Sequence, residues 1–316
     1  MRVVFMGTPD IAAGILRALI ASRHEVVGVV TQPDKPNARG NEVIFSDVKK
    51  VALEYEIPVL QPLKASSETS VEAIKELAPD IIVVVAYGQI LKENLLSLPK
   101  YRCINVHASL LPKYRGASPI QWAIINGEER TGVSIMYMDK GIDTGDVVLT
   151  RELTLAPDET AGSLYDRLTE LGGPALLDAM DMIEEGTANP VKQDDSAATY
   201  VAMLTKSMGN LDFNRPAEEL ERLVRGLIPW PGAYTYIEGR MIKFFKVRPT
   251  DKTAPCSTAS VPGRVFTLNN RELYIETSAG SLQILELQPE GKRRMPTEDF
   301  LRGCRLTDGT IASAER

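Results

Sequence analysis

Three polar residues in the middle of the chain could act together on a carbonyl group. Asn105 and His107 stand two residues apart in the stretch 105–116 (NVHASLLPKYRG), so on a strand their side chains share one face. An amide and an imidazole side by side can polarise a carbonyl and hold the oxyanion that develops on it. The acidic turn 141–146 (GIDTGD) offers a carboxylate, Asp143, that could orient the imidazole and relay a proton. Spacing alone does not place Asp143 beside His107.

Other catalytic patterns are missing from the sequence or incomplete. The other histidine of the chain, His24, lies in a polar stretch (SRHE) between a predicted helix and a predicted strand, where we expect it to be exposed. There is no G-x-S-x-G and no H-E-x-x-H motif, so covalent and metal mechanisms lack support and no metal is expected. The first turn, 7–10 (GTPD), is not G-x-G-x-x-G, and Pro9 and Asp10 oppose the close approach of a pyrophosphate. A nicotinamide dehydrogenase is therefore disfavoured.

The candidate residues belong to a region in which strands alternate with helices. We expect strands at 2–6, 25–31, 80–85, 103–107, 131–137 and 146–153, and helices at 9–21, 47–55, 71–77, 118–126 and 161–185, the last broken or kinked at 172–174 (GGP). Continuous apolar runs between helices are typical of parallel strands covered on both faces. The pattern predicts an α/β fold with a doubly wound, mainly parallel, Rossmann-like sheet. Ligands of such sheets bind outside the carboxyl ends of the strands, and His107 ends one.

The pattern changes after residue 187. An irregular polar stretch is followed by one helix at 217–227 and by short strands at 233–237, 241–247, 263–268, 272–277 and 281–288. Short strands separated by turns, without helices between them, predict a small β-barrel, which we call OB-like by analogy alone. We therefore expect a catalytic domain at 1–189, a linker at 190–207 and a C-terminal β-barrel domain at 208–316.

Composition and charge narrow the class of protein. The chain has 316 residues, 44% hydrophobic and 25% charged, which is typical of a globular protein and not of a disordered one. No apolar run approaches the roughly 18 residues of a membrane span, no signal peptide is recognisable, and three widely spaced cysteines favour a reducing compartment. We expect a cytoplasmic monomer that does not bind membranes. Residues 206–316 hold 17 basic and 14 acidic residues against 19 and 28 before them, an asymmetry that suggests different partners for the two parts.

Motifs along the whole chain give these patterns a family context. The chain resembles the folate-dependent formyltransferase superfamily, first in 105–116 and 141–146. It is most similar to the branch that acts on methionyl-tRNA, in FMGTPD (5–10), TQPDKPNARG (31–40), AYGQIL (86–91), GASPIQWAI (116–124), PWPGAY (229–234), GKRRM and DFLRGCRL. The resemblance implies transfer of a formyl group from 10-formyltetrahydrofolate to the α-amine of methionine on initiator tRNA.

The resemblance also implies roles for individual residues. Asn105 and His107 would stabilise the oxyanion of a tetrahedral intermediate formed by direct attack of the amine, and Asp143 would orient His107 and assist proton movement to the departing folate nitrogen. Folate binding is implied for Ser109, Leu110, Leu111 and Pro112 and for Gln89, Ile90 and Leu91. Without the resemblance, we would interpret SLLP as a turn with packing leucines.

Contacts with tRNA are implied at basic positions in both parts of the chain. In the loop 31–46, Arg39 matches the relatives, but Asn41 and Glu42 replace two lysines that are typical there, which removes charge where phosphates would approach. Lys49 and Lys50 lie close by, although a solvated helix face is their simpler interpretation. The remaining candidates are Lys206, Lys243, Lys246, Lys292, Arg293 and Arg294.

Three other functions stay open at this point. A related formyltransferase could act on a small amine, such as an amino sugar or glycinamide ribonucleotide. A folate-dependent deformylase and a non-catalytic tRNA-binding protein of the same fold are the other two. The match outside the catalytic core, at Arg39, 229–232 and 292–306, favours the tRNA substrate, because enzymes for small amines do not need those regions.

Overall fold

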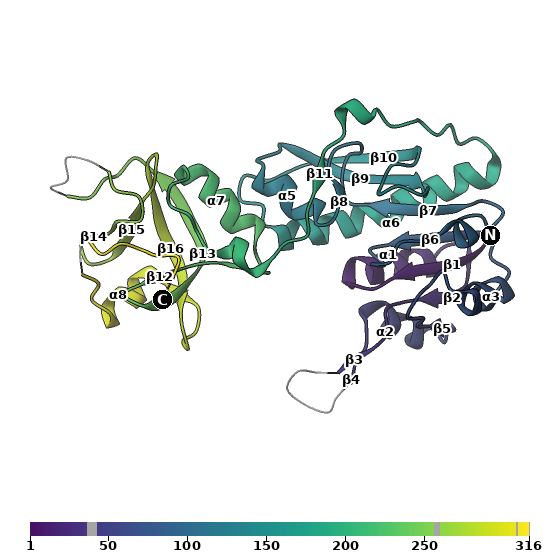
Figure 1. Cartoon of the computed structure of the whole chain (residues 1–316), viewed down its shortest axis with the longest axis horizontal. Coiled ribbons are helices and arrows are strands. Elements are labelled where there is room, and N and C mark those ends of the chain that lie inside the picture. Colours follow the sequence, from purple (N-terminus) through teal and green to yellow (C-terminus); the bar gives the residue numbers. More distant parts are fainter. Residues whose placement is uncertain (37–42, 256–259, 308, 316) are drawn as a thin grey trace. The chain divides into compact units, whose positions relative to one another are not determined.

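The computed structural model describes residues 1–36, 43–255, 260–307 and 309–315, which form two compact units (Figure 1). The first unit comprises Met1–Pro119, Arg130–Thr154 and Tyr165–Val201, and the second Ile120–Glu129, Leu155–Leu164 and Ala202–Arg316. Two short segments from the middle of the chain, 120–129 and 155–164, thus belong to the C-terminal unit. The linear boundaries expected from the sequence place both segments in the catalytic domain. Within the described ranges, no helix is both long and apolar enough to span a membrane.

A seven-stranded sheet forms the centre of the first unit. Its order is β10-β9-β7-β6-β1-β2-β5, in which the five strands from β7 to β5 are parallel and β9 runs antiparallel to both of its neighbours, β7 and β10. The strands are β1 (Arg2–Gly7), β2 (Glu25–Val30), β5 (Val59–Leu60), β6 (Ile81–Val85), β7 (Cys103–His107), β9 (Arg130–Tyr137) and β10 (Val147–Thr154). This confirms the predicted mainly parallel sheet. The order of the parallel strands reverses between β1 and β6, which is where such sheets bind ligands.

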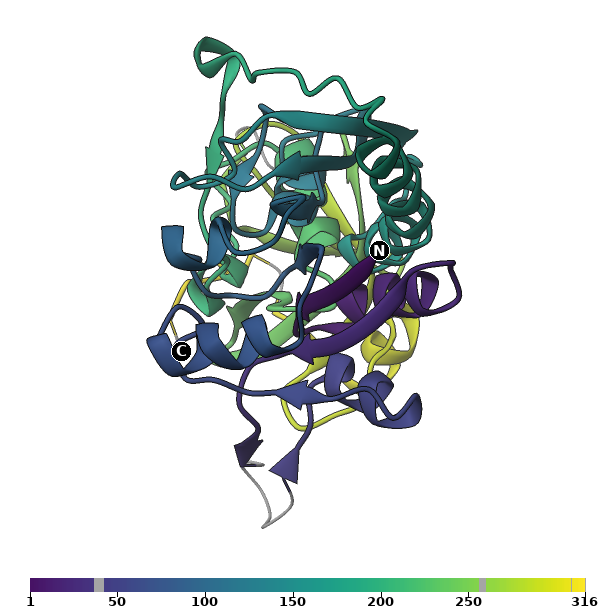
Figure 2. The same ribbon diagram turned by 90° about the vertical axis from the view of Figure 1, so that its right-hand side faces the viewer.

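Helices cover both faces of this sheet, as Figure 2 shows. They are α1 (Asp10–Ile20), α2 (Asp47–Glu54), α3 (Glu68–Glu76), α4 (Glu93–Leu96) and α6 (Ala161–Glu185), while α5 (Pro119–Ile125) belongs almost wholly to the second unit. Ile74 of α3 and Leu95 of α4 are buried in one cluster with Val4 and Val84 of the sheet. Helices α1 and α2 pack against each other, and α1 packs on α6. The strands are therefore shielded from water on both sides, as their apolar sequences require.

Of the break or kink expected at 172–174, the break is wrong, because α6 is one continuous helix with Pro174 inside it. The two glycines before the proline serve close packing. A Cβ at Gly173 would lie 2.7 Å from the Cβ of Ala18, and one at Gly14 would lie 2.3 Å from the Cγ2 of Thr169. The glycines thus let α1 and α6 approach more closely than larger residues would allow.

A larger residue at this contact should destabilise the first unit. Gly173→Leu is expected to lower the free energy of unfolding by about 3 kcal/mol, because the new side chain must displace α1. Urea denaturation followed by circular dichroism measures the change. Gly303→Leu is the control, since a Cβ at Gly303, the last residue of α8 (Thr297–Gly303), meets no atom within 4 Å. Equal stability of the two variants would show that the glycines are not packing residues.

The second unit is built on an antiparallel sheet. The order is β12-β13-β16-β15-β14, with β17 paired to β16, and the strands are β12 (Ala233–Ile237), β13 (Arg240–Thr250), β14 (Val265–Leu268), β15 (Glu272–Glu276), β16 (Ser281–Pro289) and β17 (Met295–Pro296). The segment 311–313 pairs with Tyr236 of β12 and with Arg264 just before β14, so it bridges the two edges of the sheet. The predicted C-terminal β domain is thus confirmed, with α8 and β17 as elements that the sequence did not reveal.

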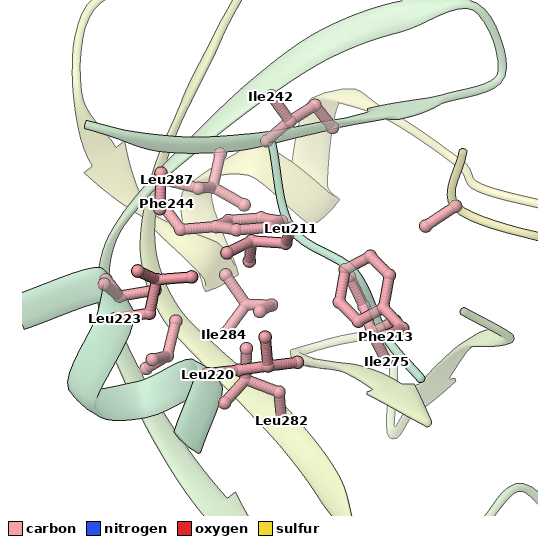
Figure 3. Packing of buried hydrophobic residues seen from close by; sticks show 14 of the residues in the cluster. Leu211, Phe213, Leu220, Leu223, Ile242, Phe244, Ile275, Leu282, Ile284 and Leu287 are labelled. Atoms are coloured by element: carbon pink, nitrogen blue, oxygen red, sulfur yellow. The ribbon is translucent and has the colours of Figure 1, made fainter. Parts of the chain in front are cut away.

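The core of this unit lies between the sheet and one helix. Leu220 and Leu223 of α7 (Ala217–Gly226) point toward Phe244 of β13 and Ile284 of β16 (Figure 3). Inward residues alternate with exposed ones along β13, so that Lys243 faces solvent between two buried neighbours. The alternation is the usual sign of an antiparallel sheet with one wet face.

The remaining short elements attach loops to the first unit. They are β3 (Lys35–Pro36) paired with β4 (Val43–Ile44), β8 (Arg115–Gly116) paired with β11 (Tyr200–Val201), and the 3-10 helix η1 (Asp195–Ala197); a second 3-10 helix, η2 (Lys206–Gly209), lies in the second unit. The pairing of β8 with β11 matters most for the site, because it fastens the segment 190–201, expected to be a linker, beside the strand that follows His107.

Candidate active site

The structure brings the three predicted catalytic residues together. Asn105 and His107 lie on β7, and Asp143 lies in the turn between β9 and β10. The Nδ2 of Asn105 is 3.5 Å from the Oδ1 of Asp143, and the Nδ1 of His107 is 3.7 Å from its Oδ2. The carboxylate therefore faces both partners, which the spacing of the sequence could not show.

The proton on His107 can be placed from its partners. The Nε2 of His107 lies 2.9 Å from the main-chain oxygen of Tyr114, which can only accept a hydrogen bond. Nε2 therefore carries a proton, and in the neutral ring Nδ1 presents its lone pair toward Asp143. His107 is 6% exposed, so these two contacts fix the ring. A proton that arrives at Nδ1 would be held between the imidazole and the carboxylate, which makes the pair a proton acceptor and donor.

Asp143 is itself held in an unusual conformation. Its φ is 54°, in the left-handed region that few residues other than glycine adopt. The main-chain N–H of Gly116 donates to its Oδ2 at 2.8 Å. Two buried side chains that the sequence did not single out, Arg115 and Gln193, lie next to this turn. Arg115 stands inside the motif 105–116 and could have been noticed there, whereas Gln193 carries no local signal in its polar segment.

The first group of folate candidates follows β6. The side chain of Gln89 binds the neighbouring loop between β5 and α3, because its Oε1 accepts from the N–H of Ala65 at 2.9 Å. Leu91 is buried, whereas Ile90 is 75% exposed and so is the residue of the three whose side chain is most accessible to a ligand. Strands β6 and β7 are paired and parallel, so this loop and the end of β7 lie at the same edge of the sheet. The geometry is compatible with the predicted folate edge.

The second group, residues 109–112, forms a tight turn after β7. Ser109 is buried, and its hydroxyl donates to the main-chain oxygen of Lys113 at 2.7 Å. Ser134 of β9 donates to the oxygen of Ser109 and accepts from the N–H of Leu111. The polar groups of Ser109 and Leu111 are thus used in hydrogen bonds that shape the turn. Leu111 and Pro112 line a cavity of about 520 Å³ together with 147–150 and 191–194, while Leu110 packs near Gly132.

Tyr87 also lies in the loop after β6. Its hydroxyl is buried and has no hydrogen-bond partner among the described residues. Burial raises the pKa of Tyr87 to about 12, so the side chain is a neutral phenol near pH 7. Tyr87 is therefore not a candidate for the base.

The described tRNA candidates are exposed and belong to the second unit. Arg39 lies outside the described residues, as do Asn41 and Glu42. Lys206 begins η2, Lys243 and Lys246 lie on β13, and Lys292, Arg293 and Arg294 lie between β16 and β17. The guanidinium of Arg294 pairs with Glu286 at 2.5 Å and lies 4.4 Å from the ring centre of Phe245 on β13. Because β13 pairs with β16, five of these six residues occupy one region of the sheet.

The two lysines near the 31–46 loop are paired with carboxylates. The Nζ of Lys49 contacts the Oδ2 of Asp34 at 2.5 Å, and this hydrogen bond holds the pKa of Asp34 below its usual value. Lys50 pairs with Asp47 on the exposed face of α2. A solvated face is thus the right interpretation for Lys50, whereas Lys49 anchors the loop.

The expectation that His24 is exposed is wrong. Its side chain is buried between the N-terminal amine, 3.2 Å from Nδ1, and Asp181, 3.5 Å from Nε2. Burial, with the neighbouring positive charges, lowers the pKa of His24. His24, Asp181 and Glu184 form a cluster of potential metal ligands, but Arg23 already binds both carboxylates. The cluster lies near the residues at which β1 and β2 begin, whereas His107 lies at the residue at which β7 ends. The two groups are therefore at opposite ends of the parallel strands.

Sequence comparisons match both units to one family. The formyl transferase profile matches residues 1–180, and the profile of the formyl transferase C-terminal domain matches 203–305. A methionyl-tRNA formyltransferase from Lachnospira eligens is 51% identical over 312 residues, which cover 98% of this chain and 99% of that protein. One from Geobacter sulfurreducens is 46% identical over 310 residues, covering 98% and 96%.

Solved structures share the fold at much lower identity. The sugar 3N-formyltransferase WlaRD has a TM-score of 0.67 at 19% identity, over 93% of this chain and 99% of that one. HypX from Aquifex aeolicus in complex with tetrahydrofolic acid has a TM-score of 0.61 at 19% identity, over 95% of this chain. The chain spans about half of HypX (47%). These likenesses concern the fold alone, whereas the two relatives above are similar along their whole length.

Proposed function

The chain belongs to the methionyl-tRNA formyltransferase family, which uses 10-formyltetrahydrofolate to formylate methionyl-tRNA, and from this premise we propose that Asn105, His107 and Asp143 perform the transfer. The observation that carries the proposal is the meeting of an amide, an imidazole and a carboxylate within 3.7 Å at the end of β7. This edge of the sheet is where α/β proteins bind their substrates.

The chemistry follows from these contacts. The amine of methionine attacks the formyl carbon, a C–N bond forms, and the carbonyl oxygen becomes an oxyanion. The second N–H of the Asn105 amide is the donor for that oxygen. A proton from the amine passes to the Nδ1 of His107 beside Asp143, and the imidazolium adds positive charge next to the oxyanion. The same proton then goes to the departing folate nitrogen as its bond to the formyl carbon breaks.

The second unit is proposed to hold tRNA through its basic residues. Lys206, Lys243, Lys246, Lys292, Arg293 and Arg294 would contact phosphates, and Arg39 would add a contact from the first unit. The excess of basic over acidic residues after Thr205 supports this role, because phosphate contacts dominate affinity for nucleic acids. We also propose that residues 109–112 and 89–91 contact folate, that the domains lie at 1–189 and 208–316 with 190–207 between them, and that the protein is a cytoplasmic monomer.

A formyl-transfer assay tests the proposed function. Purified protein is given 10-formyltetrahydrofolate with charged initiator tRNA, charged elongator tRNA or free methionine. Initiator tRNA alone should be formylated, because reading the tRNA body is the task proposed for the second unit. An amino sugar nucleotide serves as the small-amine control. If that control is formylated and no methionyl-tRNA is, the tRNA substrate is wrong for this chain.

A further inference from the structure

The side chain of Gln193 helps to hold the turn that carries Asp143. The Nε2 of Gln193 donates to the main-chain oxygen of Asp143 at 2.9 Å and to that of Gly145 at 2.7 Å. These two bonds use both hydrogens of the amide. The two hydrogen bonds fix the peptide group that follows Asp143. They thereby help to keep the φ angle of Asp143 at 54° instead of in the more populated regions with negative φ.

Gln193 is in turn fixed by a buried arginine. The Nε of Arg115 donates to the Oε1 of Gln193 at 3.0 Å. Because a guanidinium can only donate, the oxygen of the amide must face Arg115 and its nitrogen must face the turn. Arg115 is 1% exposed and Gln193 7%, so neither side chain can exchange these contacts for water without moving.

The other two arms of Arg115 reach outward to the segment that covers it. Its Nη2 contacts the Oδ1 of Asp195 at 2.8 Å, and its Nη1 donates to the hydroxyl of Tyr200 at 2.9 Å. Burial opposes the charge, but these partners outweigh it and raise the pKa of Arg115, which stays a cation. The guanidinium of Arg115 thus links Gln193, which binds the turn of Asp143, to Asp195 and Tyr200 farther along the same segment.

Strand β8, which contains Arg115, also binds the carboxylate of Asp143 directly. Gly116, next to Arg115 on β8, donates its N–H to the Oδ2 at 2.8 Å. A Cβ at Gly116 would lie 2.7 Å from the oxygen of Val201 on β11, so the approach of β8 to β11 there leaves no room for a larger residue. Residues 115 and 116 therefore fix Asp143 at two points, its carboxylate directly and its main chain through Gln193.

We propose that Gln193 is a positioning residue for formyl transfer, which holds Asp143 at the distance from His107 and Asn105 that proton transfer requires, and that Arg115 orients Gln193 for this task. The inference rests on the proposed function of Asp143. A catalytic group displaced by about 1 Å can cost about 100-fold in rate, so the effect should be in kcat, with little change in KM for either substrate.

Two substitutions separate this role from simple anchoring of the segment 190–201. Gln193→Glu keeps an acceptor for Arg115, and so keeps the segment in place, but it cannot donate to the two carbonyl oxygens. Gln193→Met removes both kinds of contact at similar length. Positioning predicts that both variants lose about 100-fold in kcat. Anchoring predicts that the Glu variant keeps its kcat. Ser196→Ala, on the exposed η1 of the same segment, is the matched control and should keep its kcat.

Two further readouts show whether the effect passes through Asp143. In an Asp143→Asn background, Gln193→Glu should change the single-turnover rate less than threefold, because the group it positions is already gone. The amide proton of Gly116, followed in protein labelled with ¹⁵N-glycine, should move upfield in the Glu variant as its bond to Asp143 lengthens. This second readout needs neither substrate nor activity.

The outcomes distinguish the two levels of the argument. An active Gln193→Glu enzyme with an unmoved Gly116 signal overturns the positioning role and leaves the proposed function intact. A further large loss on top of Asp143→Asn also overturns it, because the residue then acts elsewhere. If Asp143→Asn itself keeps the wild-type kcat, the catalytic role of Asp143 fails, and the inference about Gln193 fails with it.

Discussion

Asp143→Asn is expected to lower kcat by about 10²- to 10⁴-fold, the range for loss of a group that moves a proton in the transition state. The substituted side chain has nearly the same shape, and its oxygen can still accept the N–H of Gly116. It brings no negative charge to the Nδ1 of His107, 3.7 Å away, so a proton on that nitrogen is no longer stabilised. The proposed mechanism uses this charge in the transition state and not in the binding of folate or tRNA, so both KM values should stay within a few-fold of the wild type.

The measurement is steady-state formylation of initiator methionyl-tRNA at saturating folate, followed by single-turnover rates. Asp146→Asn is the matched control, because Asp146 lies in the same acidic turn and should lose less than threefold. Unchanged kcat in the Asp143 variant, or an equal loss in both variants, would remove Asp143 from the proton pathway. A loss confined to KM would instead assign the carboxylate to substrate binding.

The parallel part of the sheet in the first unit could be predicted because its central strands, β1 and β6, are largely apolar. Runs such as 81–85 (IIVVV) are typical of strands that are buried on both faces, and their alternation with helices leaves a parallel arrangement as the simplest solution. The end of β7 was predicted to the residue, and with it the shared face of Asn105 and His107. These features depend on local patterns, which a sequence displays directly.

Features that depend on the meeting of distant segments could not be predicted. Nothing in 141–146 shows that its carboxylate lies beside β7, because the antiparallel return of β9 and β10 sets that distance. Gln193 stands in a polar segment that looks like a linker, and it is buried through long-range contacts with Arg115 and with the turn of Asp143. The glycines of α6 likewise resemble a helix break until α1 is seen to pack on them.

Packing also groups the chain in a way that sequence order conceals. Residues 120–129 and 155–164 belong to the second unit although they lie between elements of the first. Leu155 donates its N–H to the main-chain oxygen of Glu129, so the two segments are hydrogen-bonded to each other. A division of the sequence into consecutive domains cannot represent this arrangement, because the second unit is made of three separate ranges of the chain.

Asn105→Asp should have the largest effect among substitutions that preserve shape. The amide of Asn105 is the one side-chain donor of the catalytic group that keeps a hydrogen free for the substrate oxygen, because the Nε2 proton of His107 is bound to Tyr114. Removing one donor from an oxyanion site costs about 10²- to 10³-fold in kcat. The aspartate adds a second penalty, because its negative charge would face the developing oxyanion.

The new carboxylate would also lie about 3.5 Å from that of Asp143, and two such groups do not both stay ionised at that distance. The shared proton would compete with the one that His107 must accept. Asn105→Ala removes the donor without this repulsion, so it isolates the first penalty, and we expect it to be the more active of the two variants. The difference between them in kcat then measures the electrostatic part of the effect.

The control is Asn94→Asp, since Asn94 is exposed and its amide contacts the oxygen of Ser66 and not the catalytic group. Its kcat should match that of the wild type. If Asn105→Ala is as active as the wild type, the oxyanion is held by other donors. If Asn105→Asp and Asn105→Ala are equally impaired, the charge of the aspartate does not reach the reacting carbonyl. The ranking wild type, alanine, aspartate follows only from a site in which Asn105 faces both Asp143 and the oxygen of the formyl group.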